Sequence, residues 1–321
     1  MTDNPLKNLV VICGPTASGK TTLGVTLALK YNGEIISADS RQIYKRMDIG
    51  TGKDLDEYST PNGTVPFHLI DIVDPYEIYT LYHYKSDSLK TVDNILKRDR
   101  LPFLVGGTGL YIEAVLRDYD IPAVPENPEL RKKLMQKEPL WLENELKRIN
   151  PKLYLQTDLS SKKRIIRSIE ITTYNQENPQ NGCNKSIIPS IKKDNSSLNP
   201  VVICTKWDRT VLRERIDTRL KKRLDEGLVD EVRNLINEGI PQERFVLFGM
   251  EYKHVARYLM GETSYTTMVE QLKHDIHRLA KRQETWFRGM QQRGIQINWI
   301  NNSDAGEAVK ILDRYKLINN P

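Results

Sequence analysis

Short runs of apolar and β-branched residues alternate with segments of helical spacing in the first third of the chain. The apolar runs predict strands at residues 9–13, 33–40, 67–75 and 101–105. The spacing of apolar residues predicts helices at 22–30, 79–98 and 110–116. Because strands that alternate with helices form parallel sheets, this part of the chain predicts a parallel α/β domain.

The pattern changes after residue 116. Residues 118–128 are rich in proline and acidic side chains, which is typical of a linker. Residues 128–150 and 159–174 have amphipathic helical spacing with no strand between them. Residues 175–199 are polar and interrupted by prolines and a glycine, which predicts a mobile loop. We therefore expect residues 117–199 to form a mostly helical insertion domain.

The α/β pattern resumes at an apolar run over residues 200–205, which predicts a strand. It is followed by three segments of helical spacing, at 209–226, 228–237 and 266–291. A last strand is expected at 295–300 and a last helix at 305–315. Residues 1–116 and 200–321 are therefore expected to form one α/β domain.

The first strand runs directly into the loop Gly14-Pro15-Thr16-Ala17-Ser18-Gly19-Lys20-Thr21. This is the P-loop pattern, GxxxxGK followed by Ser or Thr, between a strand and a helix. Its backbone N–H groups and the positive end of the next helix form a cradle for a diphosphate. Lys20 adds a positive charge, and the Thr21 hydroxyl can hold Mg²⁺. The alternative is a glycine-rich turn without a ligand, and the combined features favour phosphate binding without identifying the diphosphate.

Two further polar groups follow neighbouring strands of the expected sheet. Asp39 stands at the carboxyl end of the second strand, near the P-loop. Its carboxylate could reach a magnesium shell through water or act as a general base, and the alternative is a helix cap or a loop hydrogen bond. Thr108 lies in the turn Gly106-Gly107-Thr108-Gly109, which is weak evidence alone. Beside a P-loop, this turn is expected to form the second wall of the same site.

The helix predicted at 209–226 is strongly basic. Arg215 and Arg219 lie four residues apart and could clamp a diphosphate opposite Lys20, whereas residues 221–223 are expected to form a solvated face. Before this helix, Thr205-Lys206-Trp207-Asp208 matches the guanine-reading pattern of GTPases. Because no DxxG motif accompanies it, we interpret Asp208 as the N-cap of the helix.

Residues 273–288 combine a basic stripe with Trp286 and Phe287. This combination suits contact with an RNA backbone and stacking on bases, although helix packing explains the two aromatic residues equally well. His274 and His277 are three residues apart and could bind a metal. With no further ligand nearby, we favour surface histidines.

Composition narrows the class of protein. Hydrophobic residues make up 39% of the 321 residues and charged residues 28%, as in an ordinary globular protein. The start shows no signal peptide, and no apolar run reaches bilayer length, so we expect a cytoplasmic protein that does not enter a membrane. Three scattered cysteines suit a reducing compartment and argue against disulfides or a zinc site. The net charge of +6 is compatible with a polyanionic partner.

A set of motifs occurs in a fixed order along the chain, in residues 14–21, 37–45, 47–51, 68–75, 104–111, 208–209 with 215–216, and 279–288. The ordered set extends from Gly14 to Arg288 and is far more specific than a P-loop alone. It resembles the tRNA dimethylallyltransferase, or isopentenyl-tRNA transferase, family. Departures include Gly52, where the family usually has alanine, and Met250 after Gly249, where the family has tyrosine.

The resemblance implies a P-loop NTPase-like parallel sheet flanked by helices. It also implies transfer of a dimethylallyl group from dimethylallyl diphosphate to the exocyclic N6 amine of the adenosine 3′ of the anticodon in tRNA, with release of pyrophosphate. Asp39 would be the general base, Thr108 would position the reacting groups, and Arg215 would stabilise the leaving diphosphate. Mg²⁺ would bind at Thr21. The residues implied to hold the diphosphate are Gly14, Thr16, Ala17, Ser18, Gly19, Lys20, Thr21, Thr22 and Arg219.

The same resemblance implies that the anticodon stem-loop is held by the helical insertion and the basic helices, with the target adenosine flipped into a channel. We expect the protein to be a monomer. The residues implied to contact tRNA are Ser40, Arg41, Gln42, Tyr44, Gly107, Tyr111, Arg164, Arg167, Lys281, Arg282, Gln283 and Arg288.

Three other functions remain open from the sequence. An adenylate isopentenyltransferase would use the same chemistry on AMP, ADP or ATP, but has less need of an RNA grip. A P-loop kinase would use the loop for ATP and would need an arginine-bearing lid. A non-catalytic RNA-binding protein would have no need to combine Lys20, Asp39 and Thr108.

Overall fold

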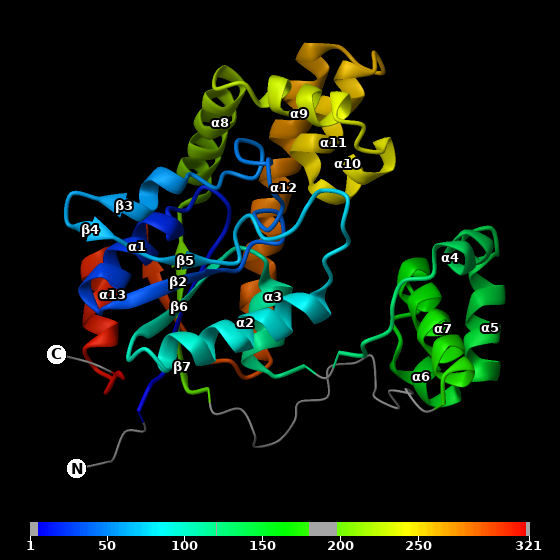
Figure 1. Cartoon of the computed structure of the whole chain (residues 1–321), viewed down its shortest axis with the longest axis horizontal. Coiled ribbons are helices and arrows are strands. Elements are labelled where there is room, and N and C mark those ends of the chain that lie inside the picture. Colours follow the sequence, from blue (N-terminus) through cyan, green and yellow to red (C-terminus); the bar gives the residue numbers. More distant parts are fainter. Residues whose placement is uncertain (1–5, 120, 180–197, 319–321) are drawn as a thin grey trace. The chain divides into compact units, whose positions relative to one another are not determined.

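The structure is a computed structural model and describes residues 6–119, 121–179 and 198–318. The chain divides into two compact units (Figure 1). One combines Met1–Leu116 with Ser197–Pro321, and the other is Arg117–Ser196.

A six-stranded sheet forms the centre of the first unit, in the order β5-β2-β6-β1-β7-β8. Every neighbouring pair is parallel, which confirms the predicted α/β class. The strands are β1 Leu9–Cys13, β2 Gly33–Ser37, β5 Phe67–His68, β6 Leu101–Gly106, β7 Pro200–Lys206 and β8 Ile297–Asn301. Strands β1, β2 and β6 are buried along their whole length, because parallel strands are covered on both faces.

The strand register places the two predicted loops at one edge of the sheet. Cys13 pairs with Gly106 of β6 and with Cys204 of β7, so β1, β6 and β7 end side by side. The chain leaves β1 into the P-loop and leaves β6 into the turn of Thr108. In an open parallel sheet this edge is where ligands bind.

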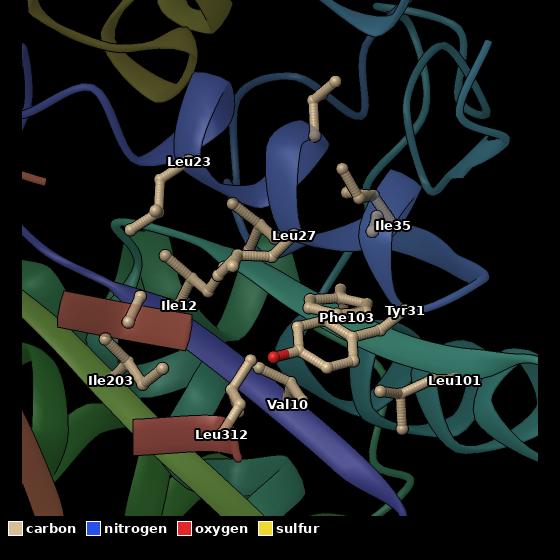
Figure 2. Close-up of a cluster of buried hydrophobic side chains, with 14 of the residues drawn as sticks. Val10, Ile12, Leu23, Leu27, Tyr31, Ile35, Leu101, Phe103, Ile203 and Leu312 are labelled. Carbon is tan, nitrogen blue, oxygen red and sulfur yellow. The ribbon is translucent and has the colours of Figure 1, made fainter. Parts of the chain in front are cut away.

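Helices cover both faces of the sheet. On one face α1 (Lys20–Lys30) and α13 (Ala305–Leu312) pack against Val10, Ile12 and Phe103, as Figure 2 shows. On the other face α2 (Leu81–Leu96), α3 (Gly109–Leu116) and the end of α12 (Tyr265–Gln292) pack against Leu104 and Val202. Each face of the sheet therefore has its own apolar core.

A further group of helices forms a separate apolar cluster. It contains α8 (Arg209–Asp225), α9 (Leu228–Asn237), α10 (Gln242–Phe248), α11 (Met250–Leu259) and the first part of α12. The sequence did not predict α10 and α11. The cluster also takes in Ile43, Tyr44 and Met47 from the loop after β2, so these helices help to fix that loop.

The predicted strand at 67–75 is wrong beyond its first two residues. Leu69 and Asp71 have φ angles of 61° and 55°, in the left-handed region that an extended strand cannot include. A short 3₁₀ helix (Leu55–Tyr58) and a hairpin of β3 (Ser59–Thr60) and β4 (Gly63–Thr64) were also not predicted.

The second unit is helical. Its helices are α4 (Pro128–Met135), α5 (Pro139–Ile149), α6 (Pro151–Gln156) and α7 (Lys162–Glu177), with a core that includes Leu142, Leu146 and Ile165. The single helix expected at 128–150 is broken because Pro139 begins a new one. The loop predicted at 175–199 lies mostly outside the described residues, and its first three residues end α7. Among the described helices none is long and apolar enough to cross a bilayer.

Candidate active site

The backbone of the P-loop has the shape of a cradle. Ala17 and Gly19 have φ angles of 60° and 78°, which turn the chain sharply into the start of α1. A Cβ atom at Gly14 would overlap the hydroxyl of Thr205 on β7, so this residue must be glycine for the loop to leave the sheet here. The positions at which the sequence places glycines are therefore required by the geometry.

Side chains from distant segments hold the outer side of this loop. The Ser18 carbonyl accepts hydrogen bonds from Trp207 Nε1, at 3.0 Å, and from the Ser303 hydroxyl. Arg215 Nε donates to the carbonyl of Ala17 at 2.8 Å, and its guanidinium lies 4.3 Å from the centroid of the Trp207 ring. Trp207 therefore supports the phosphate cradle and the arginine that faces it.

Helix α8 begins as predicted. Asp208 Oδ1 accepts from the N–H groups of Thr210 at 2.8 Å and Val211 at 3.2 Å, which confirms Asp208 as an N-cap. These hydrogen bonds hold the pKa of Asp208 below its ordinary value. The prediction of a solvated face at residues 221–223 is wrong for Arg223, which is only 8% exposed.

The P-loop and α8 enclose a cavity of about 530 Å³, lined by Lys20, Thr21, Arg215 and Arg219. Burial of the Lys20 ammonium and the charge of Arg219 lower its pKa to about 8, against the attraction of Asp39. The walls also carry the carboxylates of Asp54, Glu57 and Glu214; Asp54 pairs with Arg219 at 3.0 Å, and Glu57 accepts from the Thr22 hydroxyl at 3.0 Å. A polyanion bound here would satisfy Lys20 and the arginines together.

A second cavity, of about 690 Å³, begins at Lys20 and Thr21 and extends along the carboxyl ends of β2 and β6. Asp39 and Thr108 both line it. Asp39 Oδ1 accepts the Arg41 N–H at 2.9 Å, and Thr108 Oγ1 accepts the Ser40 N–H at 3.0 Å. The two side chains named from the sequence are therefore fixed in one cavity with the phosphate loop.

Helix α12 ties the two walls together through Gln283. Its Oε1 accepts the Thr16 N–H at 2.8 Å, and its Nε2 donates to the Gly107 carbonyl at 3.0 Å. A side chain at Gly107 would overlap Gln283 Nε2. One amide group thus bridges the P-loop and the Thr108 turn, a role that the sequence did not indicate.

The two neighbouring aromatic residues of α12, Trp286 and Phe287, have different surroundings. Phe287 is fully buried in the core, whereas Trp286 is 36% exposed and lines the larger cavity. A Cβ at Gly109 would overlap the Trp286 ring, so that glycine allows the ring to lie at the rim. Trp286 is the member of the pair that could stack on a base.

The residues of the first unit that were expected to contact tRNA fall into three groups. Those that line the larger cavity are Ser40, Arg41, Gln42, Gly107, Arg282 and Gln283. Lys281 and Arg288 are exposed on α12, and Arg288 pairs with Glu284 at 2.6 Å. Tyr44 and Tyr111 are each 6% exposed, and Tyr111 stacks on Tyr84 with ring centroids 3.8 Å apart. The structure thus gives these two tyrosines a packing role.

Arg164 and Arg167 belong to the second unit. Arg164 pairs with Asp158. Arg167 pairs with the buried carboxylate of Glu170 and donates to the carbonyl of Val124 at 2.7 Å. Both arginines are used within that unit, and Arg167 anchors the segment before α4.

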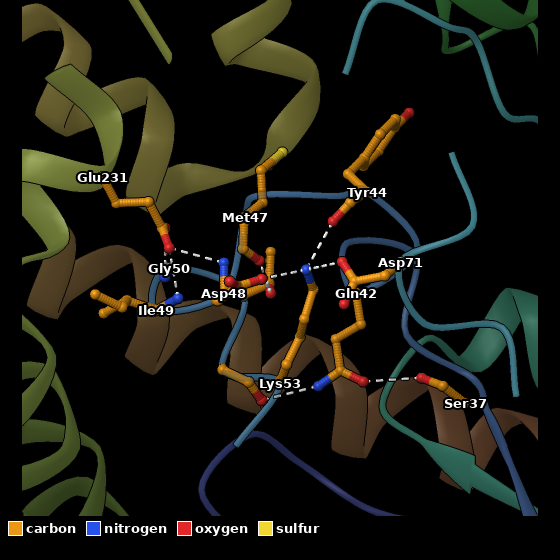
Figure 3. A network of polar contacts seen from close by, with 12 residues as sticks. Ser37, Gln42, Tyr44, Met47, Asp48, Ile49, Gly50, Lys53, Asp71 and Glu231 are labelled. Carbon is orange, nitrogen blue, oxygen red and sulfur yellow. Dashed lines mark hydrogen bonds and ion pairs between the residues drawn. The ribbon is translucent and has the colours of Figure 1, made fainter. Parts of the chain in front are cut away.

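A loop at residues 48–53, which forms part of the larger cavity, is held by buried polar groups (Figure 3). Glu231 of α9 accepts the N–H groups of Asp48 and Ile49, both at 2.7 Å, and that of Gly50 at 3.0 Å. The buried Lys53 donates to the Tyr44 carbonyl at 2.8 Å and pairs with Asp48 and Asp71. No sequence motif indicates the part played by Glu231, because it lies 183 residues along the chain from Asp48.

No cluster of three or more His, Cys, Asp or Glu residues that could hold a metal occurs within residues 6–119, 121–179 and 198–318. Of the two histidines expected at the surface, His274 is exposed, whereas His277 is partly buried and shares a hydrogen bond of 2.9 Å with Asp217. A metal at the P-loop would therefore take Thr21 Oγ1 as a protein ligand and the remaining ligands from phosphate and water.

The parallel sheet and the cradle at its edge define an α/β protein with a P-loop. Comparison with known families agrees. The family model described as IPP transferase matches residues 42–290, and one described as isopentenyl transferase matches residues 7–62.

Curated relatives match over nearly the whole chain. A tRNA dimethylallyltransferase 1 of Syntrophus aciditrophicus is 48% identical over 95% of this chain and 97% of its own length. One of Parabacteroides distasonis is 45% identical over 97% of this chain and 98% of its own. The crystal structure of a tRNA isopentenylpyrophosphate transferase from Bacillus halodurans is 33% identical, with a TM-score of 0.66, and the match covers 96% of this chain and 94% of that one. The chain belongs to the IPP transferase family and is therefore a prenyltransferase.

Proposed function

We propose that this enzyme transfers the dimethylallyl group of dimethylallyl diphosphate to the N6 amine of the adenosine 3′ of the anticodon in tRNA. The observation that carries the proposal is the meeting of two groups in one cavity. Lys20 and Thr21 provide the phosphate cradle, and Asp39 and Thr108 lie on the adjoining wall. The first group suits a diphosphate leaving group, and the second suits an attacking amine.

In this mechanism the diphosphate of the donor occupies the P-loop, facing Lys20, Arg215 and Arg219. The N6 lone pair attacks the first carbon of the dimethylallyl group, and the bond from that carbon to the diphosphate oxygen breaks. Pyrophosphate leaves with the bonding electrons, while Asp39 takes the proton from the amine. The growing charge on the leaving group is stabilised by cations that are already in place, which is the most effective form of electrostatic catalysis.

Mg²⁺ fits this arrangement. Thr21 lines both cavities, next to Lys20, and its hydroxyl offers the hard oxygen that Mg²⁺ prefers. Bound there, the ion would neutralise part of the negative charge on the departing pyrophosphate. Lys20 and Arg215 would hold the outer oxygens of the same group.

Two observations support tRNA as the acceptor. Relatives at 45–48% identity over almost the full length carry the name tRNA dimethylallyltransferase. In addition, the larger cavity is lined by Arg41, Lys253, Arg278 and Arg282, which suits a phosphodiester backbone, and by Trp286, which suits a base. We propose that the helical unit formed by residues 117–199 contacts the anticodon stem-loop and that the enzyme acts as a monomer.

A transfer assay tests the proposal and its main rival. The protein is incubated with Mg²⁺, labelled dimethylallyl diphosphate and, in separate reactions, unmodified tRNA or AMP. Label in tRNA is the expected result. Label in AMP alone would replace the proposal with an adenylate isopentenyltransferase. Hydrolysis of ATP without any transfer would overturn prenyl transfer altogether.

A further inference from the structure

Arg223 is a buried cation at the active site that the mechanism above does not use. It lies one helical turn beyond Arg219 on α8 and lines the larger cavity. Its side chain is buried, its Nη1 donates weakly to the Gly50 carbonyl at 3.4 Å, and its Nε has no hydrogen-bond partner in the described part of the chain. A buried guanidinium normally has its donors paired, because an unpaired one loses its hydration without compensation.

The guanidinium groups of Arg223 and Arg219 are close neighbours. A Cβ atom at Gly52 would overlap Nη2 of both arginines, so the two groups converge on that one point. Gly52 also has a φ angle of 60°, which favours glycine. The two guanidinium groups therefore occupy the space that a side chain at this position would fill.

Of the two guanidinium groups, only that of Arg219 forms an ion pair with a carboxylate in the described part of the chain. Arg219 pairs with Asp54 at 3.0 Å. Burial and the charge of Arg219 lower the pKa of Arg223 to about 10, while the carboxylates of Glu251 and Asp54 act in the opposite direction. Burial in turn raises the pKa of Glu251. Two adjacent cations in a poorly hydrated place are stabilised when an anion bridges them.

We propose that Arg219 and Arg223 form a two-guanidinium site for a phosphate group, within the cavity that contains Asp39. The planar forks of two arginines match the oxygens of a phosphate. The phosphate could come from either of two sources, the diphosphate of the prenyl donor or the phosphodiester of the acceptor nucleotide. Both sources follow from the proposed function, and in this respect the present proposal rests on it. Arg219 lines both cavities and Arg223 only the larger one, so the pair extends the phosphate-binding surface from the P-loop toward Asp39.

The test compares the wild-type protein with Arg223→Met and with Lys221→Met as the matched control. Lys221 is exposed on the same helix and lines neither cavity. Titration calorimetry with inorganic pyrophosphate and Mg²⁺ measures the first source without RNA. The second source is measured as KM for tRNA in the transfer assay.

Loss of a charge-assisted pair of hydrogen bonds weakens binding roughly ten- to a hundredfold. If Arg223→Met weakens pyrophosphate binding by that factor, the donor supplies the phosphate. If pyrophosphate binding is unchanged and KM for tRNA rises by that factor, the acceptor supplies it. If both quantities match those of Lys221→Met, Arg223 only supports the fold and the proposal is overturned.

Two checks keep these outcomes separate from other failures. Thermal melting shows whether Arg223→Met folds. If it does not fold, Arg223→Lys is used in its place. Lysine keeps the positive charge but not the planar fork of arginine, so this variant should lose an intermediate part of the binding affinity. If the wild-type protein binds pyrophosphate but transfers nothing to tRNA, the proposed function fails while the pyrophosphate measurement still decides the role of Arg223.

Discussion

Two loops border the larger cavity, and they are held in different ways. The P-loop turns through the left-handed residues Ala17 and Gly19 into the helix that follows at once, and side chains of other segments contact its outer side. The loop at residues 48–53 is held by side chains, mainly Glu231 from α9 and the buried Lys53. The first loop presents its polar groups to a ligand, whereas the second uses its polar groups to hold itself in place.

This difference separates chemistry from stability. Lys20 is a cation in a partly buried position with a lowered pKa, so it is unfavourable for the free protein and valuable to a bound anion. Glu231 instead stabilises the free protein, because its carboxylate accepts hydrogen bonds from backbone N–H groups that have no other role. A substitution in the P-loop should therefore reduce activity more than stability, and a substitution that disturbs the loop at residues 48–53 should reduce stability more than activity.

The largest expected effect is on Lys20→Met. Removing one preorganised positive group from a leaving-group site lowers kcat/KM roughly a hundred- to a thousandfold. The thermal melting temperature of the free protein at pH 7 should not fall, because the substitution removes a charge that burial disfavours. Transfer assays and melting curves of the same preparation check both parts. A variant that loses stability together with activity would mean that Lys20 supports the fold.

The sequence was sufficient for the P-loop because all of its parts are consecutive. It also predicted that Asp39 and Thr108 would line the same site, since parallel strands bring their carboxyl ends to one edge of the sheet. It could not find Glu231, which binds the N–H of Asp48 across 183 residues of chain. An acidic residue in the first turn of a helix looks like an ordinary response to the helix dipole.

The prediction for Arg223 failed for another reason. A run of three basic residues suggests a solvated face, and two of them, Lys221 and Lys222, are indeed exposed. However, Arg215, Arg219 and Arg223 are spaced four residues apart, so they share one face of α8. That periodicity was the signal that could have placed Arg223 at the cavity.

The next largest effect is expected for Glu231→Gln. The amide of glutamine would direct an N–H donor at backbone N–H groups or at the Tyr252 hydroxyl, which donates to the carboxylate at 2.6 Å. We expect the free energy of unfolding to fall by about 1–3 kcal/mol, as for a buried polar group left unpaired. Denaturant titration measures it.

The control for this variant is Asp230→Asn on the neighbouring exposed residue, which should change stability by less than about 0.5 kcal/mol. Kinetics sharpen the comparison of the two loops. Glu231→Gln should alter activity less than Lys20→Met does, and equal losses of activity would show that the loop at 48–53 takes part in the chemistry directly.

The smallest effect concerns pH. The pKa of Lys20 is about 8 in the folded protein, against 10.5 for a lysine that is fully exposed to water. Between these values the unfolded chain binds more protons, so this group makes the free protein more stable as pH rises through that window. Binding of pyrophosphate favours the charged form, so its affinity should fall above pH 8, by at most about tenfold per unit.

Calorimetric titrations with pyrophosphate at pH 7, 8 and 9 check this dependence, with Lys20→Met as the reference that removes the titration of the ligand itself. A wild-type profile parallel to that of Lys20→Met would mean that Lys20 does not titrate in this range.

The central claim is that the cradle and Asp39 act on one reaction in one cavity. A single-turnover reaction with Mg²⁺, dimethylallyl diphosphate and unmodified tRNA tests it most directly, with the RNA digested to nucleosides and analysed by mass. The wild-type protein should yield N6-dimethylallyladenosine and one pyrophosphate per nucleoside. Asp39→Asn should bind pyrophosphate as the wild type does but react roughly 10² to 10⁴ times more slowly, the usual loss for a general base. Full-rate transfer by Asp39→Asn, or no prenylated nucleoside from the wild type, would contradict the account.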